Sequence, residues 1–465
     1  MANIVFLFAC GTIEYLHSEK EETMEKIAGF FRFAERKTKF SIELMAGLTT
    51  FMAMAYVLAT QPGAIVGFGS PSVTDASGAV ITQEAVVVTV ALVSGLITIL
   101  MGLYSNMPFA LSTGMGSNFL LGSMIQAGTL TFSQAMGIIL VEGVIFLLLS
   151  IFGIRDLIVR MIPKNIKIAI SAAIGFFIAY LGFKNSGLGV YDGGIGMGNF
   201  TDPAVVLAVV GLVIIAVLTA YKVKGAILIG ILITTILGIP FGITTVPSSL
   251  VSVPNFSGVG DLVMKFDFST IFTPTGLILV FVTFFGDFFS TLGTVLGLGG
   301  KAGMLDKDGN LPGIEKPFLI DAIGTCVGAL FGCTTITTYV ESSAGVEAGG
   351  RTGFTAITTG VLFLIAMFLA PVFLMIPNAA TGPALIFVGF LMIQGFKDID
   401  FSDFTEAFGP FVMIMFCIFM GSIAAGIAGG ILAHILIKVM TGKANEVNVG
   451  MYILAIPLIL YFIYS

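Results

Sequence analysis

Two carboxylates stand inside otherwise apolar stretches of this sequence. Asp287 lies in FVTFFGDFFSTLGTVLG, and Glu341 lies in TTITTYVESSAGVEAGG. A carboxylate at the centre of a bilayer costs about 2.5–3.5 kcal/mol on insertion scales, so an acid placed there indicates a role in binding or transfer. Such a group can accept hydrogen bonds from ligand N–H groups, and it can carry a proton. The alternative for each acid is a structural hydrogen bond to a neighbouring hydroxyl or backbone group.

Three further acids lie in or beside apolar stretches, and a structural role explains each of them better. Glu142 is in ILVEGVIF, where a carboxylate can brace neighbouring helices. Asp321 lies near the expected start of a helix, where a negative charge favours the helix dipole. Glu347 and Arg351 are spaced i,i+4 near a helix end, which predicts an ion pair between them.

Residues for other kinds of chemistry are scarce. The sequence has two histidines, His17 and His434, and four cysteines without a CxxC pair or a metal-like spacing. A membrane enzyme would need a nucleophile with its base, or a set of metal ligands, and the sequence supplies neither. We therefore expect no catalytic residues, no metal site, no cofactor and no nucleic-acid partner.

The composition places these acids in a membrane. Of the 465 residues, 57% are apolar and only 10% are charged, whereas a soluble domain carries about 25% charged residues. The mean hydropathy is +1.05. The chain is therefore predicted to be an all-α, polytopic membrane protein.

Helices long enough to cross a membrane must position the acids. A hydrocarbon core of about 30 Å takes roughly 20 apolar residues in a helix, and about 14 stretches approach this length. In the first half they are 43–67, 81–103, 108–127, 132–154, 165–184, 203–221 and 223–240. In the second half they are 272–298, 317–333, 336–350, 352–375, 379–396, 404–420 and 421–441. A last apolar stretch, 449–464, can span, lie in the interface or pack on the bundle.

The basic residues predict the orientation of these spans. With a cytoplasmic N-terminus, only Lys184 and Lys265 of the 21 Lys and Arg residues fall outside. This distribution agrees with the positive-inside rule. If an odd number of spans were added or removed at the start of the chain, most of the basic residues would fall on the outside and the agreement would be lost.

The sequence repeats itself in a way that predicts two halves of opposite orientation. MIPKNIKIAISAAIGFFIAYLGFK begins at Met161, and MIPNAATGPALIFVGFLMIQGFK begins at Met375. Each repeat holds seven predicted spans, and this odd number forces the halves to insert with opposite orientation. Such a 7+7 inverted repeat is typical of transporters, which bind their cargo between the halves near the midplane.

Two predicted spans are too rich in Gly, Ser and Thr for simple lipid-facing helices. They are LSTGMGSNFLLG (111–122) and TTITTYVESSAGVEAGG (334–350). Broken helices are tolerated at membrane depth where their backbone groups are buried or line a cavity, and there they can hold polar ligand atoms. Close helix packing through small residues is the alternative, but it does not explain Glu341.

Six stretches of the chain resemble the AzgA-like purine permeases, a branch of the nucleobase–cation symporter superfamily. They are ELMAGLTTFMAMAYVLATQPGAI (43–65), LSTGMGSN (111–118), IGFFIAYLGFKNSGL (174–188), KAGMLDKDGNLPGIEKPFLIDAIGTCVGALFG (301–332), TTYVESSAGVEAGGRTG (337–353) and FTEAFGPFVMIMF (404–416). The resemblance runs from about residue 24 to the end, and 337–353 is nearly the family signature.

This resemblance implies proton-coupled uptake of a purine base (hypoxanthine, guanine or adenine) by elevator-like alternating access. The acids that hydrogen-bond the base in the family map onto Asp287 and Glu341, which we also expect to couple transport to protons. The other predicted substrate-binding residues are Asn118, Ser117, Phe119, Phe285, Ser290, Thr338, Tyr339 and Ser342. The expected location is the cell membrane, and a homodimer is left open.

The resemblance and the repeat together predict the domain organisation. A core domain (41–155 and 271–375) moves against a gate domain (156–240 and 376–441). The first repeat covers 41–240 and the second covers 271–441, with an extracellular loop at 241–270 between them. Residues 1–40 form a cytoplasmic extension and 442–465 a C-terminal apolar segment. We expect Met24 to be the natural start and 1–23 to be an upstream extension.

Several positions depart from the family pattern near the expected site. Gln61 stands where the family usually has Asn, Ser117 and Phe119 alter a GMGLNA-like motif, Ser290 replaces a second acid, and Ala425 replaces an Asn. The alternative cargo is therefore another heterocycle or an organic anion in the same architecture. A channel is a further alternative, but channels more often build a pore from symmetric subunits or charged rings.

Overall fold

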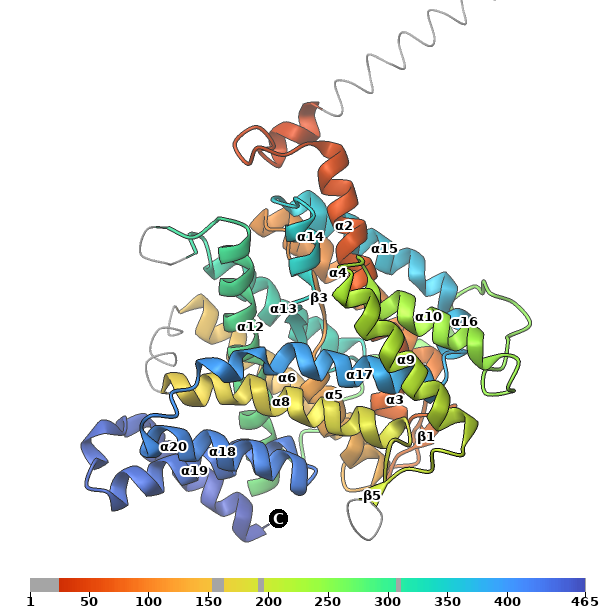
Figure 1. Ribbon diagram of the computed structural model, residues 1–465. Helices are drawn as coiled ribbons and strands as arrows, with labels where there is room; N and C mark the ends of the chain where they lie inside the picture. Colours follow the sequence, from red (N-terminus) through yellow and green to blue (C-terminus); the bar gives the residue numbers. More distant parts are fainter. Residues whose placement is uncertain (1–24, 153–162, 191–195, 307–310, 465) are drawn as a thin grey trace, which may run out of the picture.

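The structure is a computed structural model, and it describes residues 25–152, 163–190, 196–306 and 311–464. The expectation that 1–23 precede the natural start lies outside the described residues. Helices dominate the described part, and the strands are two or three residues long (Figure 1).

In the first half the helices agree with six of the seven predicted spans to within a few residues, and in the third (108–127) the helix begins at Met115, after a short strand. The first predicted span is divided at Ala55 and Tyr56. The elements are α2 (Phe40–Met54), α3 (Val57–Val66), β1 (Ser72–Thr74), β2 (Val80–Thr82), α4 (Gln83–Ser105), β3 (Leu111–Thr113), α5 (Met115–Gln126), α6 (Phe132–Ile151), α8 (Lys164–Asn185), β4 (Gly189–Val190), β5 (Gly196–Met197), α9 (Pro203–Ala220) and α10 (Ala226–Gly238).

The second half holds the remaining elements. They are α11 (Phe256–Gly260), α12 (Pro274–Lys301), α13 (Glu315–Leu330), β6 (Ile336–Thr338), α14 (Ser342–Glu347), α15 (Gly353–Ala366), η1 (Met367–Leu369), α16 (Ala370–Leu374), α17 (Asn378–Met392), η2 (Ile393–Asp398), α18 (Phe404–Phe419), α19 (Ile423–Met440), η3 (Ala444–Glu446) and α20 (Val449–Tyr464). The last of these, which covers the stretch left open above, packs on α12 and α19.

Local sequence signals set where several helices begin. The side chains of Thr82, Thr131 and Thr273 cap α4, α6 and α12 by accepting a backbone N–H of the first turn. Proline at the first position of α9 and α12 suits a helix start, because its missing N–H would be unpaired there anyway.

Many of these helices are apolar enough to cross a membrane. Within the described residues, seven meet both length and hydropathy criteria: Phe40–Val66, Gln83–Ser105, Phe132–Ile151, Lys164–Asn185, Pro203–Ala220, Pro274–Lys301 and Gly353–Leu374. Four shorter apolar helices accompany them: Ala226–Gly238, Asn378–Met392, Phe404–Phe419 and Ala425–Met440. The number of crossings, about 14 from the sequence, stays a prediction.

A short antiparallel ribbon joins the two halves at the centre. Strand β3 pairs with β6, with Ser112 opposite Thr337, and each strand leads into a helix, α5 or α14. Beyond the strands, the N–H of Gly114 donates to the carbonyl of Thr335 at 2.7 Å. The two Gly-, Ser- and Thr-rich segments therefore lie side by side, although they are far apart in the sequence.

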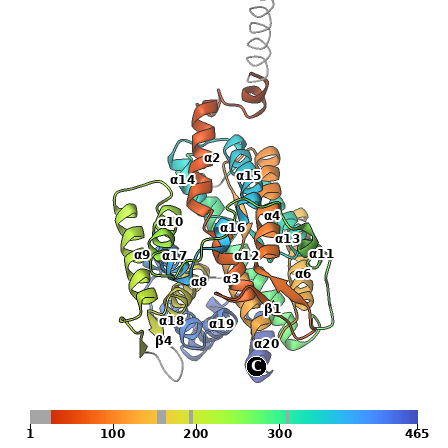
Figure 2. The same cartoon turned by 90° about the vertical axis from the view of Figure 1, so that its right-hand side faces the viewer.

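The helices pack in two groups. Helix α15 lies against α2 and α4, and α13 lies against α6 and α4. In the other group, α17 lies against α8, α9 and α10, and α18 lies against α8 and α19. Figure 2 places α9 and α10 on one side of the molecule and α6 and α13 on the opposite side. Helix α12 contacts both groups, since it also touches α8, α19 and α20.

The two helices that contain the sequence repeat, α8 and α17, cross at paired glycines. A Cβ on Gly175 would lie 3.0 Å from the carbonyl oxygen of Gly389, and a Cβ on Gly182 would lie 2.7 Å from that of Gly382. Any side chain at these points would force the helices apart. Close backbone approach therefore explains Gly175 and Gly389, which occupy equivalent positions of the repeat, as is common between membrane helices.

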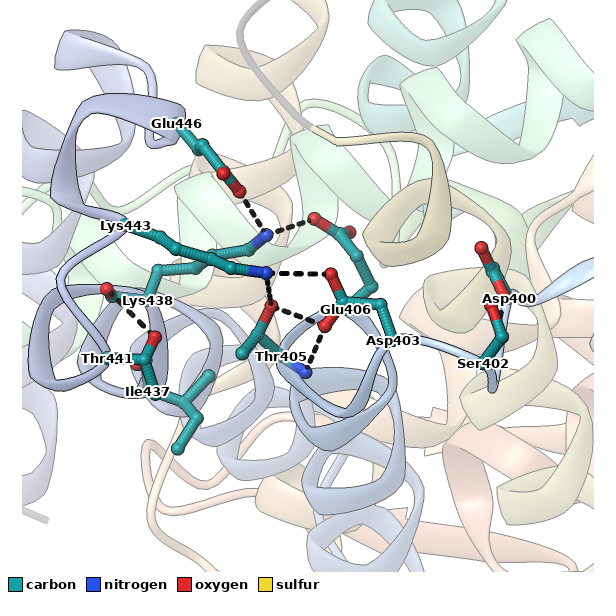
Figure 3. A network of polar contacts seen from close by, with 10 residues as sticks. All are labelled: Asp400, Ser402, Asp403, Thr405, Glu406, Ile437, Lys438, Thr441, Lys443 and Glu446. Atoms are coloured by element: carbon teal, nitrogen blue, oxygen red, sulfur yellow. Dashed lines mark hydrogen bonds and ion pairs between the residues drawn. The ribbon is translucent and has the colours of Figure 1, made fainter.

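A charged cluster anchors the C-terminal helices (Figure 3). The Nζ of Lys438 lies 2.6 Å from Glu406 and 2.6 Å from Glu446, and its side chain is 2% exposed. Beside it, Lys443 and Asp403 form an ion pair at 3.0 Å. These contacts tie the start of α18 to the end of α19 and to η3.

Candidate functional site

Asp287 lies in the middle of α12 and lines a cavity at the centre of the molecule. Its side chain is 5% exposed, and among the described residues neither carboxylate oxygen has a hydrogen-bond partner. The same cavity is lined by Ser290, one turn further along α12, and by Thr335 and Thr337 at the central ribbon. A buried carboxylate without a partner is costly, so this group is suited to hydrogen-bond a ligand.

The beginning of α5 forms another wall of this cavity. Gly114, Met115, Gly116 and Ser117 all line it. Gly114 is the capping residue of α5 and has no side chain to accept the free N–H groups of the first turn. Those groups carry the positive end of the helix dipole. The cavity therefore has a hydrogen-bond acceptor on α12 and backbone donors on α5.

Glu341 lines a second, larger cavity of about 600 Å³, which adjoins the first. The two cavities share Met115, Ser290, Thr337 and Met392. Glu341 is 8% exposed and directly precedes α14. The two acids predicted from the sequence thus line neighbouring parts of one internal space, and neither faces lipid.

The hydroxyl of Tyr56 donates a hydrogen bond to Oε1 of Glu341 at 2.7 Å. Tyr56 lies in the interruption between α2 and α3, and it lines the same cavity as Glu341. With 1% of its side chain exposed, it is held firmly by its surroundings. The first predicted span therefore contributes directly to the site.

Threonine hydroxyls connect the site to two acids behind it. Thr335 donates to both carboxylate oxygens of Glu142 at 3.0 Å. Asp321 accepts from Thr291 at 2.8 Å and from Thr338 at 3.1 Å. Both acids are fully buried. Glu142 ties α6 to the residue before β6, in keeping with the predicted bracing role, and Asp321 ties α13 to α12 and β6. The predicted interaction of Asp321 with the helix dipole stays a prediction.

The predicted pairing of Glu347 with Arg351 is wrong. Glu347 forms an ion pair with Lys301 at 2.9 Å instead. The guanidinium of Arg351 donates to the backbone carbonyls of Val346 and Gly350. Helix α14 ends at Glu347, so the chain leaves the helix before the i,i+4 geometry is reached.

Six of the ten predicted substrate-binding residues line the two cavities. They are Ser117, Asp287, Ser290, Thr338, Tyr339 and Glu341. The hydroxyl of Tyr339 also donates to the carbonyl of Thr113, which ties the ribbon together. The predicted roles of these residues in binding remain predictions.

The other four predicted residues surround the site without lining it. Asn118 donates to the Gly114 carbonyl and accepts from Thr334. Phe119 stacks on Phe68, with ring centres 6.2 Å apart. Phe285 packs against two neighbouring phenylalanines of α12, and Ser342 accepts the N–H of Ala110. Their contacts in the structure are with the protein.

Several cavity residues were not singled out from the sequence. Tyr56, Thr337, Lys164 and Lys167 all line the larger cavity. For Tyr56 a signal was available, because a polar side chain in an apolar span next to a Pro-containing segment can mark a helix interruption. Nothing in the sequence around Lys164 and Lys167 separates them from ordinary cytoplasmic lysines. Among the described residues, no group of three or more His, Cys, Asp or Glu is placed to hold a metal ion.

Comparison with known proteins identifies the family. The model named Xan_ur_permease, described as "Permease family", matches residues 41–430. The chain belongs to this permease family. It is therefore a multi-pass membrane transporter and not an enzyme.

Two permeases with named substrates are similar to this family member over almost its whole length. The guanine/hypoxanthine permease PbuG of Bacillus subtilis is 36% identical, covering 94% of this chain and 99% of its own. The adenine permease AdeP of Escherichia coli is 32% identical, covering 97% of this chain and 99% of its own.

Solved structures support the predicted fold of this permease. The transmembrane domain of the cyanobacterial bicarbonate transporter BicA has a TM-score of 0.58 and 16% identity, over 84% of this chain and 97% of that domain. Murine Slc26a9, an anion transporter in its inward-facing state, has a TM-score of 0.59 and 13% identity, over 86% and 69%. The 7+7 inverted-repeat fold predicted from the sequence is confirmed by these likenesses.

Proposed function

We propose that this permease is a secondary active transporter that takes up a purine nucleobase. Relatives that resemble it from end to end are named as guanine/hypoxanthine and adenine permeases. Both kinds of base are small and planar, and they carry hydrogen-bond donors and acceptors around most of the ring. A membrane protein that carries them needs an internal space with hydrogen-bond donors and acceptors close together.

The observation that carries this proposal is the unpartnered carboxylate of Asp287 next to the uncapped start of α5. A purine presents N–H groups beside ring nitrogens and carbonyl or amino groups. Its N–H groups can donate to Asp287 and Glu341, while its acceptors face the N–H groups of α5 and the hydroxyls of Ser117 and Ser290. The substrate then supplies the hydrogen bonds that the buried acid lacks.

Proton coupling follows from the same acids. Asp287 forms no ion pair within the described part of the chain, so its negative charge is not compensated by a protein cation. A proton bound at each of Asp287 and Glu341 would let the loaded site cross the membrane without the two negative charges, which reduces the cost of the movement. The energy source is then the proton gradient, and no cofactor is required.

The helix packing supports movement of a core domain against a gate domain. Contacts are extensive within each group of helices, while α12 and a few short contacts join the groups. The central ribbon, α5 and α14 belong to the proposed core, and α8 and α17 of the proposed gate close the cavities with Lys164, Lys167 and Met392. We place the N-terminus in the cytoplasm and the protein in the cell membrane. Its proposed protein partner is a second copy of the chain.

Uptake into proteoliposomes tests the proposal. Purified protein is reconstituted with an inward-directed proton gradient, and accumulation of radiolabelled hypoxanthine is measured with unlabelled guanine, adenine or small carboxylates as competitors. We expect saturable uptake that purines inhibit and that a protonophore abolishes. Asp287→Asn should remove it, whereas Asp261→Asn, an exposed acid outside the cavities, should not. No effect of any purine on uptake would exclude the proposal.

One observation favours a second candidate cargo, an organic anion. Lys164 and Lys167 line the cavity that contains Glu341 and supply positive charge at its edge. In the same assay, uptake of a labelled small carboxylate that purines do not inhibit would support this candidate over the first.

A further inference from the structure

We infer that Tyr56 sets the selectivity of the site between purines with and without an amino group at carbon 2. This inference rests on the proposed function. Its starting point is the hydrogen bond from the Tyr56 hydroxyl to Oε1 of Glu341 at 2.7 Å. Within the part of the chain that the structure describes, it is the single side-chain hydrogen bond that this carboxylate accepts.

A free carboxylate can accept two parallel hydrogen bonds, one on each oxygen. Guanine offers such a pair, because its ring N1–H and its 2-amino group point in the same direction. Hypoxanthine has the same ring N–H but no amino group at carbon 2. If no protein group donated to Glu341, its carboxylate would therefore bind guanine more tightly than hypoxanthine by one charge-assisted hydrogen bond.

Tyr56 changes this preference because it occupies one of the two oxygens. The hydroxyl and the carboxylate line the same cavity, and both side chains are more than nine-tenths buried. Tyr56 is also fixed in place, since it lies between α2 and α3 and its backbone carbonyl accepts a helical N–H from Thr60. The other oxygen, Oε2, accepts no hydrogen bond from a described side chain, and the N–H that guanine and hypoxanthine share can donate to it.

Replacement of Tyr56 by phenylalanine isolates the effect. Tyr56→Phe keeps the ring and removes the hydroxyl, so Oε1 of Glu341 becomes free to accept the 2-amino group. The inhibition constants of guanine and of hypoxanthine are measured against labelled hypoxanthine uptake. We expect the ratio of the guanine constant to the hypoxanthine constant to fall roughly tenfold, the value of one hydrogen bond to a charged group.

Two tyrosines provide matched controls. Tyr339→Phe removes a hydroxyl from the same cavity, but that hydroxyl donates to the Thr113 carbonyl and not to Glu341, so the ratio should stay unchanged. Tyr452→Phe removes a hydroxyl that donates to the Ala444 carbonyl at the C-terminal end, so uptake itself should stay unchanged.

The outcomes separate this inference from the proposed function. If the wild-type protein neither transports nor binds purines, the proposed function fails, and the inference that rests on it fails with it. If purines are cargo and Tyr56→Phe changes both constants equally, the hydroxyl only stabilises the site and the inference is refuted. A selective loss of guanine would refute it too, because the hydroxyl would then be a direct acceptor for the amino group. If the variant does not transport, the purine-dependent increase in unfolding temperature gives the same ratio from binding alone.

Discussion

Asp287 and Asp321 are buried to a similar degree, but their replacement should have opposite effects on the empty protein. Asp287 has no hydrogen-bond partner among the described residues, whereas Asp321 accepts from Thr291 and Thr338. An uncompensated carboxylate in a membrane interior is unfavourable, and an amide of the same shape is less so. Asp287→Asn should therefore stabilise the protein without substrate by about 1–2 kcal/mol.

The satisfied acid gives the contrasting result. Asp321→Asn replaces one accepting oxygen by an NH₂ group, so one of the two threonine hydroxyls loses its acceptor. A buried polar group left without a partner costs about 1–3 kcal/mol, and the variant should be destabilised by that amount. Differential scanning fluorimetry of both variants in one detergent would measure the two shifts, which are a few degrees at most for a chain of this size.

Addition of substrate completes the experiment on Asp287. Purine should raise the unfolding temperature of the wild-type protein, and Asp287→Asn should lose most of this increase. The loss of a hydrogen bond to a charged group corresponds to a roughly 10- to 100-fold weaker affinity. Equal destabilisation of the two variants without substrate would show that Asp287 is held by a structural partner. Asp287 would then not be available to bind the substrate, and its assignment to the site would be refuted.

Three further perturbations test the packing and the charged cluster. Gly182→Ala should destabilise the protein by about 1–3 kcal/mol, because the added methyl group would meet the backbone of α17, while Gly297→Ala, with open space around it, should be neutral in the same chemical unfolding assay. Lys438→Met leaves two glutamates facing each other and should lower the free energy of unfolding by about 2 kcal/mol. Lys443→Met should lower it by less than about 1 kcal/mol, because the ion pair of Lys443 with Asp403 is more exposed. Hydrogen bonds from a threonine hydroxyl and from Lys443 hold the pKa of Asp403 well below its usual value, so its contribution is present above about pH 4 and is lost as the pH falls further. Unfolding measured from pH 7 to pH 3 should therefore show a smaller acid-dependent loss for Asp403→Asn than for the wild type.

The periodic features of the fold were predictable from the sequence. Helices fall where apolar stretches of about 20 residues predict them, because the membrane leaves few other solutions for the backbone. The repeat at Met161 and Met375 predicted two related halves, and the structure shows that the repeated helices α8 and α17 also contact each other. That direct contact does not follow from the repeat alone.

The candidate site was predictable only in part. Asp287 and Glu341 stand out because a carboxylate in an apolar stretch has a large and known cost. The bond between Tyr56 and Glu341 joins residues 285 positions apart, and no local pattern encodes such a contact. Asn118 and Ser342 make their hydrogen bonds in the structure within the protein, and their predicted part in ligand binding stays a prediction.

The ribbon of β3 and β6 has a consequence for how cargo can travel. Its strands come from opposite halves of the chain, yet their backbones are hydrogen-bonded to each other and to the loops that follow. Pulling α5 away from α14 would break several buried backbone hydrogen bonds at membrane depth, where unpaired backbone groups are costly. Helices α5 and α14 must therefore move together as one rigid unit. Any sliding surface has to lie outside this unit, where α12, α5 and α3 contact α8, α17 and α19.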